Sequence, residues 1–127
     1  EAADNDIDVF AIPGASAVLS ALVVSGFPLD SFVFVGFLPQ KGEKRKKSIL
    51  YLKYDRRTTI IYESPHRIIN LLELILEILG DREVSVSREL TKMFEETVRG
   101  NVSVVLEKLK KTSPRGEYTV VLKGVDD

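Results

Sequence analysis

The segment Tyr62-Glu63-Ser64-Pro65-His66-Arg67 gathers a carboxylate, the chain's single histidine and an arginine at one point of the sequence. It follows a run of β-forming residues at 58–61 and precedes a long helical pattern that begins at Ile68. Ser64 is a typical N-cap residue and Pro65 suits the first helical position, so a strand-to-helix turn is predicted here. Open α/β sheets tend to bind ligands at such turns. An ordinary helix start with solvated charged neighbours is the alternative.

Three further clusters combine turn residues with groups that can bind a ligand. They are Pro13-Gly14-Ala15-Ser16, Arg88-Glu89-Leu90-Thr91-Lys92 with the following Phe94-Glu95, and Arg115-Gly116-Glu117-Tyr118. Ser16 is predicted either to cap a helix or to direct its hydroxyl at a ligand across the turn. No cluster matches a Gly-x-Gly-x-x-Gly loop, a phosphate-loop lysine signature or a serine nucleophile elbow. No motif therefore defines a catalytic site by itself.

A basic stretch from Lys41 to Arg57 has eight lysines and arginines against two acidic residues, a local charge of +6 in a chain of net charge −1. A helix is predicted within this stretch, at 43–54. Its apolar residues Ile49, Leu50 and Leu52 lie in its second half, so its first half is expected to project into solvent. A basic patch on an otherwise acidic protein is a candidate contact for phosphate groups. A solvated face that keeps the protein in solution is an equally open interpretation.

The composition is that of a globular domain and excludes several chemistries. The chain has 127 residues, of which 44% are hydrophobic and 29% charged, enough for one domain with a buried core. The absence of cysteine excludes disulfides and thiolate sites, and a single histidine argues against a protein-built zinc site. No apolar run approaches a membrane span, and the acidic N-terminus lacks the features of a signal peptide. We therefore expect no metal, no membrane contact and a cytoplasmic location.

Strand and helix patterns alternate along the chain and must position these groups. Strands are predicted at 7–12, 32–37, 58–62, 84–87 and 118–123, with a further short strand at 95–100. Helices are predicted at 15–24, 43–54, 68–79 and 101–111, and the third is apolar except for a stripe of Asn70, Glu73 and Glu77. Gly80 is expected to end that helix and Asn101 to cap the last one, while residues 88–96 are expected to form a polar loop. The alternation predicts one α/β or α+β domain with a sheet of about five strands.

Five motifs occur in a fixed order along the chain. They are Pro-Gly-x-Ser-Ala at 13–17, Gly-Phe-Leu-Pro at 36–39, Tyr-Glu-Ser-Pro-His-Arg at 62–67, Arg-Glu-Leu-Thr-Lys-x-Phe-Glu-Glu at 88–96, and Gly-Glu-Tyr at 116–118 before a Val-Val-Leu strand. Together they resemble the C-terminal half of the ribosomal RNA small subunit methyltransferase I family, within the tetrapyrrole (corrin/porphyrin) methylase superfamily. The resemblance covers residues 9–123, nearly the whole chain.

The resemblance implies an S-adenosylmethionine-dependent methyltransferase that methylates the ribose 2′-oxygen of a cytidine in 16S rRNA, within the small ribosomal subunit. Members of the family have two α/β domains, bind the methyl donor in the cleft between them and generally form homodimers. Residues 1–127 are accordingly expected to be the single C-terminal domain, with a mixed sheet of about five strands packed with helices. The N-terminal domain, with its glycine-rich cofactor loop, is absent from this chain, which is expected to be inactive alone.

The same resemblance suggests roles for individual residues. The residues expected at the cofactor are Ser16, Ala17, Tyr62, Glu63, Gly116 and Glu117. The candidates for orienting or deprotonating the target hydroxyl are Glu63, His66 and Glu89, because in-line methyl transfer requires both functions. A salt-linked network with Arg67, Arg88 and Lys92 that only shapes the cleft wall is the alternative. The residues expected to follow the RNA backbone are Lys44, Arg45, Lys46 and Lys47, extended by Arg67, Arg88 and Lys92.

Two other functions stay open at this point. A methylase of a tetrapyrrole, such as a corrin precursor, would use the same fold, although the basic stretch and the Tyr62–Arg67 motif favour RNA. A non-enzymatic α/β module for RNA binding or dimerisation is the third interpretation, and it would be favoured if the native gene began near Glu1.

Overall fold

The chain folds as a mixed β-sheet with helices on both faces, in a computed structural model that describes residues 15–90 and 93–126. Its elements are α1 (Ala15–Ser25), β1 (Phe32–Phe37), α2 (Gly42–Leu50), β2 (Thr58–Glu63), α3 (Ile68–Leu79), β3 (Glu83–Leu90), β4 (Met93–Asn101), α4 (Val102–Lys110) and β5 (Glu117–Leu122). The five described strands lie in the order β1-β2-β5-β3-β4, with β1 and β2 parallel and the other neighbours antiparallel. The predicted α/β architecture is confirmed, while the strand predicted at 7–12 lies outside the described residues.

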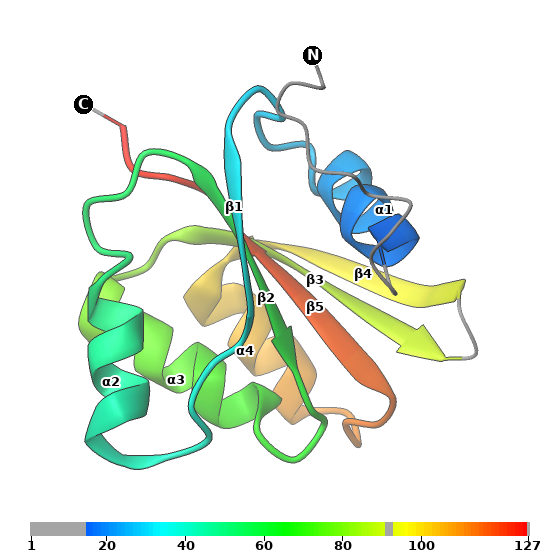
Figure 1. The fold of residues 1–127 in the computed structure, drawn as a ribbon. Helices are drawn as coiled ribbons and strands as arrows, with labels where there is room; N and C mark the ends of the chain where they lie inside the picture. Colours follow the sequence, from blue (N-terminus) through cyan, green and yellow to red (C-terminus); the bar gives the residue numbers. More distant parts are fainter. Residues whose placement is uncertain (1–14, 91–92, 127) are drawn as a thin grey trace.

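The two faces of the sheet bury separate apolar clusters, because side chains alternate along each strand. Ile61 and Val120 belong to the larger cluster, which α2, α3 and α4 complete. Ile60 and Val121 belong to the smaller cluster, which they form with Ala21 and another residue of α1. Figure 1 shows α1 on one side of the sheet and the other three helices on the opposite side. Each residue at a strand end can therefore be assigned to one of these two faces.

Helix α3 is confirmed at the predicted residues 68–79. Six of its apolar side chains are buried against the sheet and α4, whereas Asn70, Glu73 and Glu77 lie on the predicted exposed stripe. Gly80 ends the helix with a φ of 94°, a conformation that residues with a Cβ rarely adopt. Among the described residues, no helix is both long and apolar enough to cross a membrane.

The start of α3 differs from the prediction. Ser64 and Pro65 do not begin the helix, because residues 65–67 form a turn in which the Arg67 N–H donates to the Ser64 carbonyl at 3.1 Å. The Glu63 carboxylate accepts the Ser64 backbone N–H at 3.0 Å and so holds the segment as a turn. The helix begins at Ile68, with Arg67 at its N-cap position. The prediction that Ser64 caps the helix is therefore wrong.

Residues 88–90 and 93–96, which were predicted to belong to a polar loop, lie in two paired β-strands instead. Strand β3 continues to Leu90, and β4 begins at Met93. The hydroxyls of Ser87 and Thr97, which face each other across the two strands, are hydrogen-bonded at 3.0 Å. Strand pairing of this kind overrides the polar composition that suggested a loop. The end of β3 is thereby placed beside β5.

Helices α2 and α4 differ from the prediction at one end each. Helix α2 stops at Leu50 because the following residues tighten into a turn, where the Lys53 N–H donates to the Leu50 carbonyl at 3.0 Å. Asn101 occupies the N-cap position of α4, but its side chain makes no capping hydrogen bond. The Asp81 carboxylate accepts the Ser103 N–H at 2.8 Å and its hydroxyl at 2.7 Å instead. These two hydrogen bonds lower the pKa of Asp81.

Candidate functional site

Three of the sequence clusters meet at one end of the sheet. The C-terminal end of β2 carries Tyr62 and Glu63, the first residue of β5 is Glu117, and Glu89 lies near the end of β3. Because the strands lie in the order β2-β5-β3, these groups are neighbours: Glu63 stands opposite Tyr118, and Glu117 stands opposite Glu89. Segments far apart in the sequence therefore lie side by side at this end of the sheet. This end, formed by the last residues of β2 and β3 and the first residues of β5, is called the edge below.

Side-chain alternation divides this edge between the two faces of the sheet. The residues on the α1 face are Tyr62, Glu89 and Glu117, and those on the face covered by α2, α3 and α4 are Glu63, Arg88 and Tyr118. Gly116 turns the chain into β5 with a φ of 77°, in the left-handed region that favours glycine. Since Glu63 and Glu89 lie on opposite faces, the predicted acids do not form one catalytic group.

The α1 face of the edge combines aromatic rings with two carboxylates. The Tyr62 ring makes edge contacts with Phe34 and Phe37, at centroid distances of 5.2 and 5.5 Å. Burial and, to a lesser extent, the charge of Glu89 raise the pKa of Tyr62, so its hydroxyl is neutral at neutral pH. Glu89 and Glu117 face each other directly, and no ion pair to either carboxylate is formed within the described part of the chain. Opposed like charges are unfavourable on a sheet unless a cation lies close.

The other face of the edge contains a buried ionic network around Glu63. Arg45 Nη2 donates to Glu63 Oε1 at 2.6 Å, and these two side chains are 1% and 3% exposed. Arg67 Nε lies 3.4 Å from Glu63 Oε2. Arg45 also donates through Nε to Asn70 Oδ1 at 2.9 Å and through Nη1 to the Pro39 carbonyl at 3.0 Å. One arginine thus joins α2, the loop after β1, the end of β2 and the start of α3.

This network corrects the expectation for Arg45. The side chain does not project into solvent and is not available to RNA, because its guanidinium is buried and bound to Glu63, Asn70 and Pro39. Arg45 shares a helical face with buried Ile49 and Leu52, a spacing of four and seven residues that is already visible in the sequence. Its neighbours on α2 stay exposed as predicted, namely Lys44, Lys46 and Lys47.

The remaining predicted residues have less defined surroundings. His66 is exposed in the turn between β2 and α3. Ser16 and Ala17 belong to α1, but their side chains lie outside the described residues, and so does Lys92. No group of histidine, aspartate and glutamate side chains within residues 15–90 and 93–126 has the composition of a metal site.

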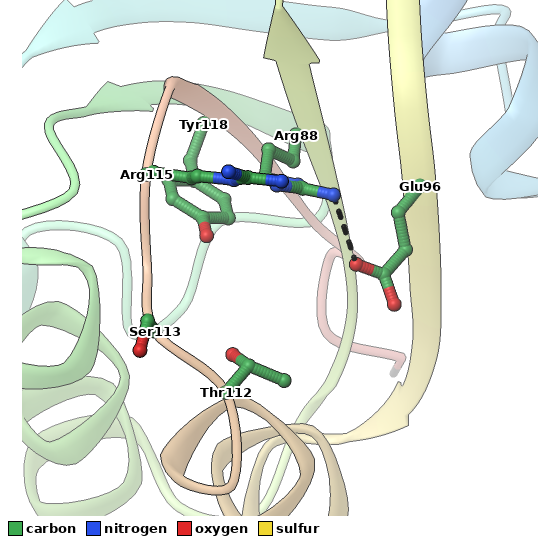
Figure 2. Close-up of a pocket in the computed structure, with 6 residues that line it drawn as sticks. All are labelled: Arg88, Glu96, Thr112, Ser113, Arg115 and Tyr118. Atoms are coloured by element: carbon green, nitrogen blue, oxygen red, sulfur yellow. Dashed lines mark ion pairs between the residues drawn. The ribbon is translucent and has the colours of Figure 1, made fainter.

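A cavity of about 300 Å³ on the α4 side of the edge was not predicted from the sequence. The residues that line it are Arg88, Glu96, Thr112, Ser113, Arg115 and Tyr118 (Figure 2). The sequence analysis singled out Arg88 and Glu96 in the segment 88–96, and Arg115 and Tyr118 in the segment 115–118. Thr112 and Ser113 carry no distinguishing pattern, because only the return of the chain from α4 to β5 brings them to the cavity.

Comparison with known proteins defines the family. Residues 1–105 match the family model of the tetrapyrrole (corrin/porphyrin) methylases, and the chain therefore belongs to this family. It is 48% identical over 118 residues to ribosomal RNA small subunit methyltransferase I of Thermotoga maritima, which covers 93% of this chain and 53% of that protein. The protein of the same name from Bacillus subtilis is 44% identical over 116 residues, covering 91% of this chain and 40% of its own length.

A solved structure supports the same fold. The chain superimposes on cobalt precorrin-4 methyltransferase, a cobalamin biosynthetic enzyme, with a TM-score of 0.56 and 13% identity, covering 84% of this chain and 48% of that one. At this identity the similarity shows the fold alone. The chain spans about half the length or less of the curated relatives cited above. The resemblance predicted from the five motifs is confirmed.

Proposed function

We propose that the chain is the C-terminal domain of an S-adenosylmethionine-dependent methyltransferase whose substrate is 16S rRNA in the small ribosomal subunit. The proposed target atom is the ribose 2′-oxygen of a cytidine. The observation that carries this proposal is the edge at which Tyr62, Glu89 and Glu117 converge. It occurs in a chain that resembles ribosomal RNA small subunit methyltransferase I over 93% of its length. A homodimer and a cytoplasmic location belong to the same proposal.

The residues on the α1 face of the edge fit the proposed methyl donor. S-adenosylmethionine supplies an activated methyl group on a positively charged sulfonium, and it also carries an ammonium group and ribose hydroxyls. The opposed carboxylates of Glu89 and Glu117 suit a cationic ligand, because positive charge relieves their mutual repulsion. The neutral Tyr62 hydroxyl can donate or accept a hydrogen bond. Ser16, Ala17 and Gly116 complete the proposed contacts.

The proton on the target hydroxyl requires an acceptor close to the reacting atoms. Glu89 is one candidate, because its carboxylate forms no ion pair within the described residues. It is also close enough to Tyr62 for its charge to raise the pKa of the Tyr62 hydroxyl. His66 is the other candidate, since it is exposed and a ring nitrogen of imidazole can accept a proton. Glu63 is held by two arginines and suits a positioning role, in which it fixes the backbone of the 62–67 turn beside the cofactor.

The proposed RNA surface is the exposed basic face of α2. Its residues are Lys44, Lys46 and Lys47, and the proposal also assigns RNA contacts to Arg67, Arg88 and Lys92. Lysines on an exposed helix face supply attraction to phosphates that depends on salt and not on base sequence. Base pairing and shape within the ribosomal subunit would then select the target nucleotide.

A transfer assay with the full-length protein tests the proposed function. We expect radiolabelled methyl groups from S-adenosylmethionine to enter 16S rRNA of undermethylated 30S subunits, at a single ribose that becomes resistant to alkaline cleavage. Fully methylated subunits serve as the control and should accept no label. Labelling of a porphyrinoid in place of rRNA would favour a tetrapyrrole methylase. Absence of transfer to either substrate would favour a non-enzymatic module.

A further inference from the structure

The cavity on the α4 side of the sheet lies on the face opposite to the proposed cofactor contacts. Arg88, Glu96 and Tyr118 reach it from three adjacent strands, since Arg88 stands opposite Tyr118 in β5 and opposite Glu96 in β4. The connection from α4 to β5 closes the other side with Thr112, Ser113 and Arg115. Paired strands and a helix end thus form its walls.

The cavity walls concentrate positive charge. Figure 2 shows the guanidinium groups of Arg88 and Arg115 along one wall, with Thr112 and Ser113 across the cavity. The acid at this site is Glu96, whose Oε1 lies 3.8 Å from Arg88 Nη2. That distance is long for an ion pair, and the Glu96 side chain is 51% exposed against 18% for Arg88. Glu96 can therefore turn away from the cavity when a stronger anion arrives.

One donor of the Arg88 guanidinium lacks a hydrogen-bond acceptor among the described residues. This donor is Arg88 Nε, which is buried and has no hydrogen-bond partner in the described part of the chain. Buried donors in folded proteins are nearly always satisfied, by protein, water or ligand. On the opposite wall, the Thr112 hydroxyl and N–H both donate to the Leu109 carbonyl, at 2.9 and 3.1 Å, so this carbonyl at the end of α4 is already satisfied. The charged donors that line the cavity are therefore the two guanidinium groups, and Glu96 is the charged acceptor that competes for them.

We infer that this cavity is a phosphate subsite that binds a backbone phosphate of the RNA substrate. Two guanidinium groups match the oxygens of a phosphate, because each can donate two parallel hydrogen bonds. A volume of about 300 Å³ is at the lower end for ligand sites and admits a phosphate with part of its nucleoside. The phosphate chemistry rests on the cavity, whereas the assignment to RNA rests on the proposed function.

The inference makes opposite predictions for two residues of the cavity. Arg115→Gln removes an exposed donor, and we expect it to weaken binding of a single-stranded oligoribonucleotide about tenfold at low salt. The slope of log affinity against log salt should become shallower by about 0.7, the value for one lost contact with a single strand. Glu96→Gln removes the competing acid and should tighten binding severalfold. The matched control is Lys123→Gln, which alters one charge at the other end of β5 and should have neither specific effect.

The measurement is fluorescence anisotropy of the labelled oligoribonucleotide with the 127-residue chain and each variant, at several salt concentrations. Circular dichroism checks that each variant is folded. Equal effects of Arg115→Gln and Lys123→Gln, or no tightening by Glu96→Gln, would overturn the inference. Inorganic phosphate separates the two sources of the anion: NMR shifts of the arginine side chains with phosphate, without any effect of Arg115→Gln on RNA binding, would contradict the RNA assignment. Because this assay contains no methyl donor, its outcome is independent of whether methyl transfer is observed.

Discussion

Replacing Arg45 with methionine is expected to lower the free energy of unfolding by about 3–5 kcal/mol, the cost of breaking a buried ion pair by removing one partner. The ion pair with Glu63 is 2.6 Å long and both side chains are almost fully buried, so after the substitution the Glu63 charge keeps only Arg67, at 3.4 Å, as a charged partner and little solvent reaches it. Asn70 and the Pro39 carbonyl lose a donor in the same substitution. Urea denaturation of the chain, followed by circular dichroism, measures the loss.

A double-mutant cycle separates the ion pair from simple loss of packing. Glu63→Gln in the Arg45→Met background removes the buried negative charge that has lost its Arg45 partner. The loss of unfolding free energy in the double variant should therefore be smaller than the sum of the losses in the two single variants. Arg57→Met is the matched control, because Arg57 pairs with Asp55 at the surface with a side chain that is 51% exposed. Its effect on unfolding should be small. Strictly additive losses at Arg45 and Glu63 would contradict a coupled buried pair.

Neutralising Lys44, Lys46 and Lys47 together is expected to weaken binding of the full-length protein to the small ribosomal subunit by about two orders of magnitude at low salt. All three are exposed on α2, whereas Arg45 between them must be retained for stability. The slope of log affinity against log salt concentration should become shallower by about 2, because three phosphate contacts are lost. Filter binding at several salt concentrations measures both quantities.

The matched control removes the same charge elsewhere. Glutamine at Lys108, Lys110 and Lys123, on α4 and after β5, lowers the net charge equally but leaves the α2 surface intact. We expect this control to keep most of the affinity. If both triple variants lost affinity equally, the α2 face would act only through overall charge. If neither lost affinity, the basic stretch would be a solvated face without a role in RNA binding.

The elements that depend on local pattern were predictable from the sequence. Helix α3 has the predicted bounds, because its apolar and polar residues recur with helical spacing and Gly80 ends it. Strand β2 was predictable from its run of β-forming residues, and its observed bounds exceed the predicted ones by one residue. The family was recognisable because short motifs keep their order along the chain.

Features that depend on specific side-chain contacts or on the strand order were not predictable. Ser64 has the type of an N-cap residue, but the carboxylate of Glu63 takes its N–H and a turn forms instead. The helical spacing of Arg45 from Ile49 and Leu52 was visible in the sequence, but its partner Glu63, 18 residues away in β2, was not. The phosphate subsite requires residues from β3, β4, β5 and the end of α4, whose proximity follows only from the strand order. A contact between neighbouring residues decided the first case, and tertiary contacts decided the other two.

The most direct measurement is calorimetric titration of the full-length protein with S-adenosylhomocysteine, the product form of the proposed cofactor. The double variant Tyr62→Phe/Glu117→Gln retains the aromatic contacts but removes one hydroxyl and one carboxylate from the α1 face. If this edge binds the cofactor, the affinity of the double variant for S-adenosylhomocysteine should fall at least about tenfold, as expected for the loss of hydrogen bonds to charged groups. Glu77→Gln, on the exposed stripe of α3, should bind like the unmodified protein. Unchanged affinity in the double variant would contradict the assignment of this edge to the cofactor.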